Sequence, residues 1–394
     1  MELDGKKVLL IIPDDTRTCP LNMILTEINS LFKPKVEKLD MLIALGTHAP
    51  LSMEAIYKYL EIDEKTHKEE FSKTEIFNHL FDNPDHLLDI GEIPAGQMEY
   101  LTDGKLSYSI MVNVNKMIFK YDQIIIIGPT FPHEVVGFSG GNKYLFPGVA
   151  GQKIIDSFHW LGALITNREI IGTHYTPVRR FIDYCASMVD LPKYCISLVV
   201  TQKGLHGIYA GKPEEAYEEA AKHAAKTHIK WCPKPYKTVL SICPPMYPEL
   251  WTAAKCMYKM EPVVEQGGTL IIYAPHMDEI SVVHGEHIKE IGYHTLPYFE
   301  AQMDKFKHIP GGVLAHSTHV RGSGTYENGV ETPNVKNVIL ASKIPEEVCK
   351  SINLGYMDPD SINIADYENR EDEGILVVPH AGEVLHKLES EKEQ

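Results

Sequence analysis

The stretch Gln123-Ile-Ile-Ile-Ile-Gly-Pro129 places four isoleucines in a row and stops at a Gly-Pro pair. A short, continuous, β-branched apolar run of this kind is typical of a strand buried on both faces of a parallel sheet. Two similar runs precede it, at 7–12 and 38–45, and apolar residues at helical spacing lie between them at 20–32. This alternation of strand and helix predicts an α/β fold with a parallel sheet.

A second series of candidate strands lies at 238–242, 269–273, 335–341 and 374–378. The short polar segment 231–236 contains two prolines, which is typical of a linker. The sequence therefore predicts two domains, 1–235 and 236–380, each a largely parallel sheet flanked by helices, and a charged tail at 381–394. We expect the active site in the cleft between the domains, because ligand sites commonly form there.

The composition is that of an ordinary globular protein, with 44% hydrophobic and 23% charged residues. It excludes a disordered chain, a collagen-like repeat and a disulfide-stapled mini-protein. Acidic residues outnumber basic ones by 54 to 38, which gives a formal net charge of −16. An acidic surface repels a phosphate backbone, so we expect no nucleic-acid partner.

The first residues and the cysteines bear on the compartment. The chain opens with the charged sequence Met1-Glu-Leu-Asp-Gly-Lys-Lys7, and the apolar run that follows is only strand-sized. We therefore expect neither a signal peptide nor a membrane helix. The seven cysteines are scattered and include no Cys-x-x-Cys pair. This usage favours buried thiols in a reducing cytoplasm and argues against a cysteine zinc site.

Three polar segments follow three predicted strands. They are Pro-Asp-Asp-Thr-Arg at 13–17, Gly-Thr-His at 46–48, and a segment from His133 to Lys143. In open α/β sheets, ligands bind outside the carboxyl ends of the strands. We therefore expect the arginine, a histidine and the lysine of these segments at one edge of a sheet.

The third segment contains Ser139-Gly140-Gly141-Asn142-Lys143. Glycines expose backbone N–H groups, which suits a phosphate. The spacing matches neither a Walker motif nor a dinucleotide-binding fingerprint. A glycine-rich turn with an exposed lysine is the alternative interpretation.

Three histidines accompany these segments, namely His48, His133 and His159. Imidazole is both a common metal ligand and the usual acid or base at neutral pH. The pattern therefore indicates a metal, a proton-transfer pair, or both, although each histidine alone is also compatible with a structural role. Arg17 can hold a carboxylate through two hydrogen bonds, or can pair with a neighbouring aspartate.

Together these segments resemble the lactate racemase family, the nickel-pincer-nucleotide-dependent racemases and epimerases of 2-hydroxy acids. The resemblance is carried by Asp14-Asp15-Thr16-Arg17, Gly46-Thr47-His48, the motif from His133 to Gly148, and His159. It runs over most of the chain and is strongest from residue 8 to about 180. The ten-residue spacing from His133 to Lys143 is its most specific element.

The resemblance implies a cofactor, a pyridinium mononucleotide whose two sulfur arms hold nickel. In the family a lysine is joined to it through a thioamide, which corresponds to Lys143 here. His159 would fill the open in-plane position, since square-planar N/S ligation suits Ni(II). Asp14 and Thr16 would line the cofactor, with Asp14 offsetting the pyridinium charge, and the Ser139-Gly140-Gly141 loop would hold the phosphate. Separate biosynthetic proteins make the cofactor and would be transient partners.

The resemblance also implies an isomerase mechanism by hydride transfer. His48 and His133 correspond to the two family bases. One takes the proton of the 2-hydroxyl while the C2 hydride leaves, and the other returns a proton after the hydride has come back to the opposite face. Two bases are needed because the two enantiomers present the hydroxyl on opposite sides. Arg17 would anchor the substrate carboxylate.

The second domain is expected to contribute substrate contacts. The family has a tyrosine–glutamine pair followed by a lysine three residues after the glutamine. Lys255 fits that lysine, unless it is a solvated helix residue, whereas Trp251 and Thr252 replace the pair. This departure favours a substrate other than lactate.

The polar stretch 316–326 is predicted to be a loop, which either lies on the surface or supplies hydroxyl contacts. With Thr252 it favours a multi-hydroxyl acid such as an aldonate, of the gluconate 2-epimerase type, because buried hydroxyls need partners. Malate is an alternative that needs an extra cation, for which Arg321 or Lys255 would serve.

Three further functions remain open. A zinc- or nickel-dependent hydrolase would use His48, His133 and His159 directly as ligands. A non-catalytic nucleotide-binding module would use only the glycine-rich loop. A two-base racemase would abstract a proton from C2 without hydride transfer.

Overall fold

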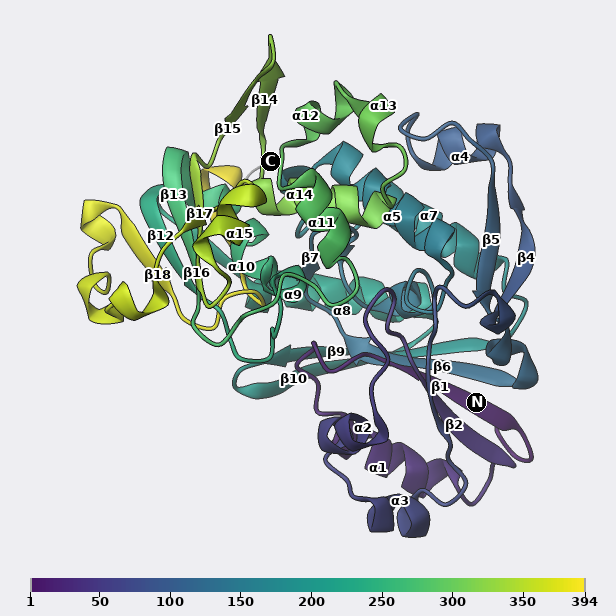
Figure 1. The fold of residues 1–394 in the computed structure, drawn as a ribbon. Helices are drawn as coiled ribbons and strands as arrows, with labels where there is room; N and C mark the ends of the chain where they lie inside the picture. The colour runs from purple at the N-terminus through teal and green to yellow at the C-terminus, as the bar shows by residue number, and fades with distance from the viewer. Residues whose placement is uncertain (1, 393–394) are drawn as a thin grey trace. The chain divides into compact units, whose positions relative to one another are not determined.

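The computed structural model describes residues 2–392, which form two compact units (Figure 1). The first unit comprises the residues up to Phe131, Ser139–Phe158 and Pro177–Ala224. The second comprises Pro132–Phe138, His159–Thr176 and the residues from Ala225 onward. The units are thus discontinuous in sequence, unlike the single boundary predicted near residue 235. The predicted linker at 231–236 lies inside the second unit.

The first unit is built on a six-stranded sheet of order β10-β9-β6-β1-β2-β3. Its strands are β1 (Lys7–Ile12), β2 (Lys38–Ile43), β3 (Ile76–Asn78), β6 (Gln123–Pro129), β9 (Lys193–Thr201) and β10 (Gly204–Gly211). All neighbours run parallel except β9 and β10, which pair antiparallel. The sheet is therefore mixed. The predicted parallel arrangement is confirmed for all neighbouring strands except β9 and β10.

The helices of the first unit are α1 (Leu21–Phe32), α2 (Met53–Leu60), α3 (Glu64–Glu70), α4 (Ala95–Leu101) and α7 (Pro177–Ser187), with short turns η1 (Pro84–His86), η2 (Lys116–Lys120) and η3 (Gly141–Tyr144). A hairpin joins β4 (Leu87–Ile93) to β5 (Ile110–Asn115). Two helices, α5 (Gln152–Ile165) and α8 (Pro213–His228), contribute residues to both units. The apolar face of α1 packs with alternate residues of β1 in one core, which is why α1 was recognisable from the helical spacing of its apolar residues.

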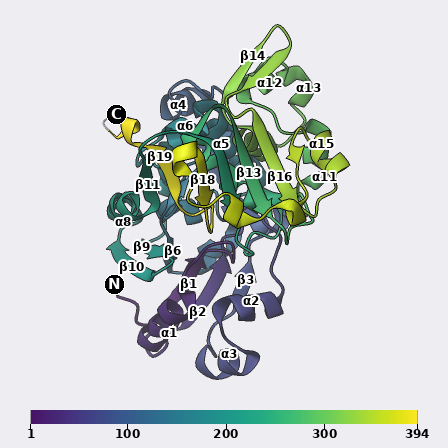
Figure 2. The same cartoon turned by 90° about the vertical axis from the view of Figure 1, so that its left-hand side faces the viewer.

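The second unit contains a fully parallel five-stranded sheet of order β17-β16-β13-β12-β18 (Figure 2). Its strands are β12 (Tyr236–Ile242), β13 (Val264–Ala274), β16 (Asn337–Ser342), β17 (Gly355–Tyr356) and β18 (Ile375–Val378). Two-stranded pairs are β7 (Pro132–His133) with β8 (Gly137–Phe138), β11 (Ile229–Cys232) with β19 (Leu385–Leu388), and β14 (Gly324–Glu327) with β15 (Val330–Pro333). The four strands predicted for this half are confirmed.

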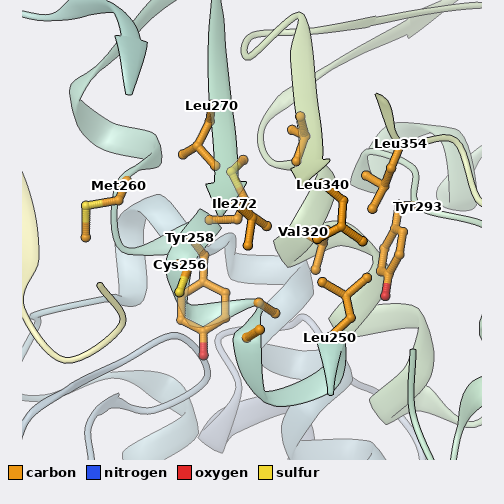
Figure 3. Close-up of a cluster of buried hydrophobic side chains, with 14 of the residues drawn as sticks. Leu250, Cys256, Tyr258, Met260, Leu270, Ile272, Tyr293, Val320, Leu340 and Leu354 are labelled. Carbon is orange, nitrogen blue, oxygen red and sulfur yellow. The ribbon is translucent and has the colours of Figure 1, made fainter. Parts of the chain in front are cut away.

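The helices of the second unit are α6 (Asn167–Ile170), α9 (Leu250–Ala253), α10 (Lys255–Tyr258), α11 (Gly285–Ile291), α12 (Leu296–Glu300), α13 (Met303–Phe306), α14 (Gly311–Arg321) and α15 (Glu346–Ser351). Short turns are η4 (Glu261–Val263), η5 (Pro359–Ser361), η6 (Ile364–Asp366), η7 (Glu371–Glu373) and η8 (Glu389–Glu391). Figure 3 shows Leu270 and Ile272 of β13 and Leu340 of β16 packed with Val320 of α14 and Leu250 of α9. This core holds α9 and α14 against one sheet.

The prediction of a loop at 316–326 is wrong for its first half. Residues 316–321 end α14, whose residues from Gly312 to Arg321 are all buried. A helix buried all round lacks the apolar stripe by which helices are recognised. The glycines after it, together with Ser and Thr of modest helix propensity, made the stretch resemble a loop.

The predicted charged tail is partly ordered. β19 pairs parallel with β11, and the short η8 turn follows it. Residues 393–394 lie outside the described part. All seven cysteines are free thiols. None of the helices within 2–392 combines the length and apolar character needed to cross a membrane.

Candidate active site

The turn after β1 is organised by Asp14, whose side chain is almost completely buried. One carboxylate oxygen, Oδ1, accepts hydrogen bonds from the Thr16 backbone N–H at 3.0 Å and from the Thr16 hydroxyl at 2.6 Å. The Arg17 guanidinium lies 3.8 Å from the same oxygen and also donates to the Thr16 hydroxyl. The three residues predicted to act together therefore form one hydrogen-bonded turn.

The other carboxylate oxygen of Asp14 contacts His48. Asp14 Oδ2 lies 2.7 Å from His48 Nδ1, and the His48 side chain is 22% exposed. The contact forms because β1 and β2 are parallel neighbours, so the loops after them meet. Since an ionised carboxylate only accepts, Nδ1 must donate, and Nε2 is left as the basic nitrogen.

Asp14 is held in its charged form. Burial by itself raises the pKa of this carboxyl. The charges of Arg17 and His48 and the hydrogen bonds from His48 and Thr16 outweigh burial and hold the pKa well below its usual range. A buried anion thus lies between a guanidinium and an imidazole.

The glycine-rich loop uses its serine structurally. The Ser139 hydroxyl donates to the Pro129 carbonyl at 2.9 Å and accepts from the Phe131 N–H at 3.1 Å, which fixes the loop to the end of β6. Its single proton is therefore committed within the protein. The loop can therefore offer a phosphate its backbone N–H groups but not the proton of this hydroxyl.

The two glycines are required by close packing. Gly140 has φ +95°, and a Cβ there would lie 2.1 Å from Thr130 Oγ1. Gly141 has φ +58°, and its Cβ would lie 2.8 Å from Tyr217 Cβ. Buried Arg179 donates to the Gly140 carbonyl at 3.1 Å. The loop is therefore rigid for reasons independent of any ligand.

Lys143 follows this loop within η3, and its side chain is half-buried. The preceding Asn142 donates to Asp183 at 2.9 Å and to Glu214 at 2.7 Å. These bonds fix the backbone immediately before Lys143. The loop thus presents the lysine from a defined position.

Replacing Gly140 with alanine is expected to lower the free energy of unfolding by about 3 kcal/mol, because the backbone conformation is essentially restricted to glycine and the methyl group meets Thr130. Urea unfolding measures the change. Gly104→Ala is the matched control, since Gly104 also has positive φ (+78°) but no atom within 4 Å of the added carbon. A similar loss in both variants would contradict the packing argument.

In the second unit, His133 at the end of β7 is paired with the next residue. Its Nδ1 lies 3.3 Å from Glu134 Oε2 and accepts from the Val135 N–H at 3.2 Å. Burial raises the pKa of Glu134, but interactions with charged His133 and Lys255 hold it well below its usual range. Glu134 is therefore an anion beside a predicted catalytic histidine.

His159 on α5 is half-buried and lies near His319 of α14. Burial lowers the pKa of His319 to about 4, with Glu134 opposing and His159 adding to the shift. His319 is therefore neutral at pH 7. Sequence reasoning missed both Glu134 and His319. Adjacency to His133 was the only sequence signal for Glu134, and His319 was assigned to the wrong kind of element.

The predicted substrate residues of the second unit lie on α9 and α10. Lys255 is only 7% exposed, and its ammonium lies 4.4 Å from the Tyr247 ring centroid, so it is not a solvated helix lysine. The Thr252 hydroxyl donates to the Glu249 carbonyl at 3.0 Å and is buried. Trp251 is half-buried between two histidine rings.

The chemistry of these residues fits the implied cofactor in three respects. Lys143 offers an amine on a fixed turn, His159 offers an imidazole, which suits Ni(II), and Asp14 offers a buried anion. Ser139 does not fit as a side-chain phosphate donor. Within 2–392, no group of three or more His, Cys, Asp or Glu residues is arranged to hold a metal ion without such a cofactor.

Known sequences similar to this chain are lactate racemases. The family described as the lactate racemase N-terminal domain matches residues 2–172. A lactate racemase from Thermoanaerobacterium thermosaccharolyticum is 25% identical over 293 residues, and one from Lactiplantibacillus plantarum is 25% identical over 284. Each match spans 70% of this chain and 61% of the relative, which is less than two thirds of its length.

Two solved structures are similar. A crystal structure of a Thermotoga maritima protein from the Northeast Structural Genomics Consortium has 31% identity and a TM-score of 0.90, covering 98% of this chain and 95% of that one. The lactate racemase apoprotein of T. thermosaccharolyticum has a TM-score of 0.72, covering 98% and 87%. Its 20% identity supports the fold alone. Residues 2–172 therefore belong to the lactate racemase N-terminal domain family, and the chain is a distant homologue of lactate racemases.

Proposed function

We propose that this protein is an isomerase that inverts C2 of a 2-hydroxy acid by hydride transfer with a nickel-pincer nucleotide. The Asp14–His48 pair carries the proposal. A buried, charged carboxylate holds the imidazole Nδ1 at 2.7 Å, with Arg17 in the same turn. This arrangement provides a base with an available Nε2 beside a cation that suits a carboxylate.

In the proposed mechanism, Arg17 binds the substrate carboxylate and His48 removes the proton of the 2-hydroxyl through Nε2. Asp14 keeps the imidazole in the required tautomer and stabilises its charged form, as the buried aspartate of a catalytic triad does. For the opposite enantiomer His133 would be the base, which requires the tautomer whose Nδ1 donates to Glu134 instead of accepting from the Val135 N–H. Glu134 lies 3.3 Å from the His133 ring and would stabilise its positive charge. Lys255 belongs to the same charged cluster and would help to orient the substrate.

The cofactor would be held by the residues that the family resemblance implies. Lys143 would carry it through the thioamide, and His159 would ligate the nickel. Asp14 and Thr16 would line it, and backbone groups of the Ser139-Gly140-Gly141 loop would contact its phosphate. When bound, it would supply a reversible hydride acceptor for the C2 hydrogen. Cofactor-building proteins would be transient partners.

An aldonate is the proposed substrate class, although two of the predicted hydroxyl contacts are not available in the structure. The Thr252 hydroxyl is bonded to Glu249, and Thr318 donates to the Ala315 carbonyl at 2.8 Å, so neither hydroxyl needs a substrate partner. Arg321 donates to the Val335 carbonyl at 3.1 Å, which leaves Lys255 as the cation for the malate alternative. Trp251 and Thr252, in place of the tyrosine–glutamine pair of the family, still favour a substrate other than lactate.

The reaction is tested with enzyme carrying cofactor and a 2-hydroxy acid deuterated at C2. In ordinary water we expect inversion with the label retained at C2 in both isomers, because the hydride returns from the cofactor. Nuclear magnetic resonance of the product measures the label. Loss of deuterium to water would favour two-base proton abstraction, and unchanged activity in His48→Ala and His133→Ala would leave these histidines without a catalytic role. Equal turnover of lactate and gluconate would contradict the aldonate preference.

A further inference from the structure

Trp251 is enclosed on both faces of its indole ring. The His316 ring stacks on it with centroids 4.1 Å apart and an interplanar angle of 10°. The His284 ring lies 4.2 Å away at 33°. His284 precedes α11 and His316 belongs to α14, so two separate elements of the second unit cover the ring. With both faces covered, the half-buried indole presents its edge.

The stack is anchored through the main chain. His316 Nε2 lies 3.1 Å from the Trp251 carbonyl, so this nitrogen carries the proton and donates to the acceptor. The backbone N–H of Trp251 donates to the Ile280 carbonyl at 3.0 Å. The Val282 N–H donates to the Glu249 carboxylate at 2.7 Å, which ties the loop before His284 to the residues before α9. The indole therefore has little freedom to turn a face outward.

The indole edge carries an available donor. The indole N–H of Trp251 makes no hydrogen bond with any residue between 2 and 392. Its nitrogen is also not one of the fully buried, unpaired side-chain nitrogens of that range, so solvent reaches it. Lys255, the predicted substrate lysine, begins the next helix, α10, four residues further along the chain. Oxygen is the natural partner of such an N–H group, whereas an aromatic ring would need an open indole face.

We propose, building on the function proposed above, that His284 and His316 are positioning residues that make Trp251 a hydrogen-bonding edge instead of a stacking surface. Trp251 then selects 2-hydroxy acids with an oxygen on C3, such as aldonates, over acids with an aromatic substituent. The two histidines determine specificity without touching the substrate.

The first test compares gluconate and phenyllactate as substrates of the cofactor-loaded enzyme. We expect the wild type to have a kcat/KM at least about tenfold higher for gluconate than for phenyllactate, which corresponds to the free energy of one hydrogen bond to the substrate. His284→Ala or His316→Ala uncovers an indole face and should shift the ratio toward phenyllactate by about three- to tenfold. His316→Phe retains a stacked ring and should restore the wild-type ratio. His308→Ala, which removes an exposed histidine of the same unit, is the matched control.

The second test needs neither activity nor cofactor. The chain has three tryptophans, so ¹⁵N-labelled protein gives three indole N–H signals, and Trp251→Phe identifies the relevant one. Gluconate should move the Trp251 signal, whereas phenyllactate should not. Trp231→Phe is the control and should leave the gluconate response intact. An unmoved Trp251 signal at saturating gluconate would overturn the inference.

The outcomes separate the two proposals. Loaded enzyme that inverts none of the 2-hydroxy acids overturns the proposed function, and this inference with it. Loaded enzyme that inverts phenyllactate as well as or better than gluconate overturns the inference alone. Unchanged substrate ratios in both alanine variants, if they are folded, would also overturn it.

Discussion

Asp14→Asn is expected to lower kcat/KM for inversion by about a thousandfold while the protein stays folded, by analogy with the loss of the aspartate in a catalytic triad. An asparagine amide can donate to His48 Nδ1, which would leave the imidazole proton on Nε2 and remove the base. The variant also loses the negative charge that stabilises the imidazolium. Steady-state kinetics on cofactor-loaded enzyme measures the effect.

Asp15→Asn is the matched control, because it makes the same chemical change at an exposed neighbouring position. We expect it to change kcat/KM by less than about tenfold, within the range of an indirect electrostatic effect. Equal losses in the two variants would mean that the charge of the turn matters and that the contact with His48 does not. Equal activity of Asp14→Asn and wild type would remove the Asp14–His48 pair from the mechanism.

The same substitution predicts a pH dependence of stability. The pKa of Asp14 is lowered in the folded state, so its contribution to stability is complete above the unfolded pKa of about 4 and is lost as the pH falls toward the folded value. The difference in free energy of unfolding between wild type and Asp14→Asn should therefore be largest near pH 7 and shrink below about pH 4. Urea unfolding at pH 7, 4 and 3 checks it, and a constant difference would contradict the assignment.

Strands were the most predictable part of the fold. β6 and β1 are buried on both faces, so their sequences are almost continuously apolar and were recognised by composition alone. The discontinuous units were not predictable, because 132–138 and 159–176 carry no change in composition to mark their membership of the second unit. Membership depends on long-range packing, which local patterns do not encode.

The candidate site divides in the same way. Asp14 and His48 were predictable neighbours, since parallel strands place their carboxyl-end loops together. The proximity of Glu134 and His319 was not predictable, because these residues follow β7 and belong to α14, which are nearly two hundred residues apart in the sequence. The role of Ser139 also needed coordinates, because the residue type suits a phosphate equally well as a carbonyl partner.

Lys143→Ala is expected to abolish cofactor attachment and reduce inversion to background. Only the lysine amine can form the implied thioamide, and η3 fixes its backbone through the bonds of Asn142. The measurement is intact and peptide mass, with nickel assayed on the same sample, for protein made together with the cofactor-building enzymes. Wild type should show a nucleotide-sized adduct on the Lys143 peptide and about one nickel per chain, the stoichiometry of one lysine-linked cofactor.

Two controls decide what this result means. Lys143→Arg keeps the positive charge without the acylable amine, so it should behave like Lys143→Ala if attachment is the role and like wild type if charge is the role. Lys153→Ala removes an exposed lysine at the start of α5 and should retain both adduct and nickel. Nickel retained by Lys143→Ala would favour direct ligation by histidines. Unmodified wild type from cells that make the cofactor would favour a non-catalytic nucleotide-binding module, because the rigid glycine loop would then have no covalent chemistry to position.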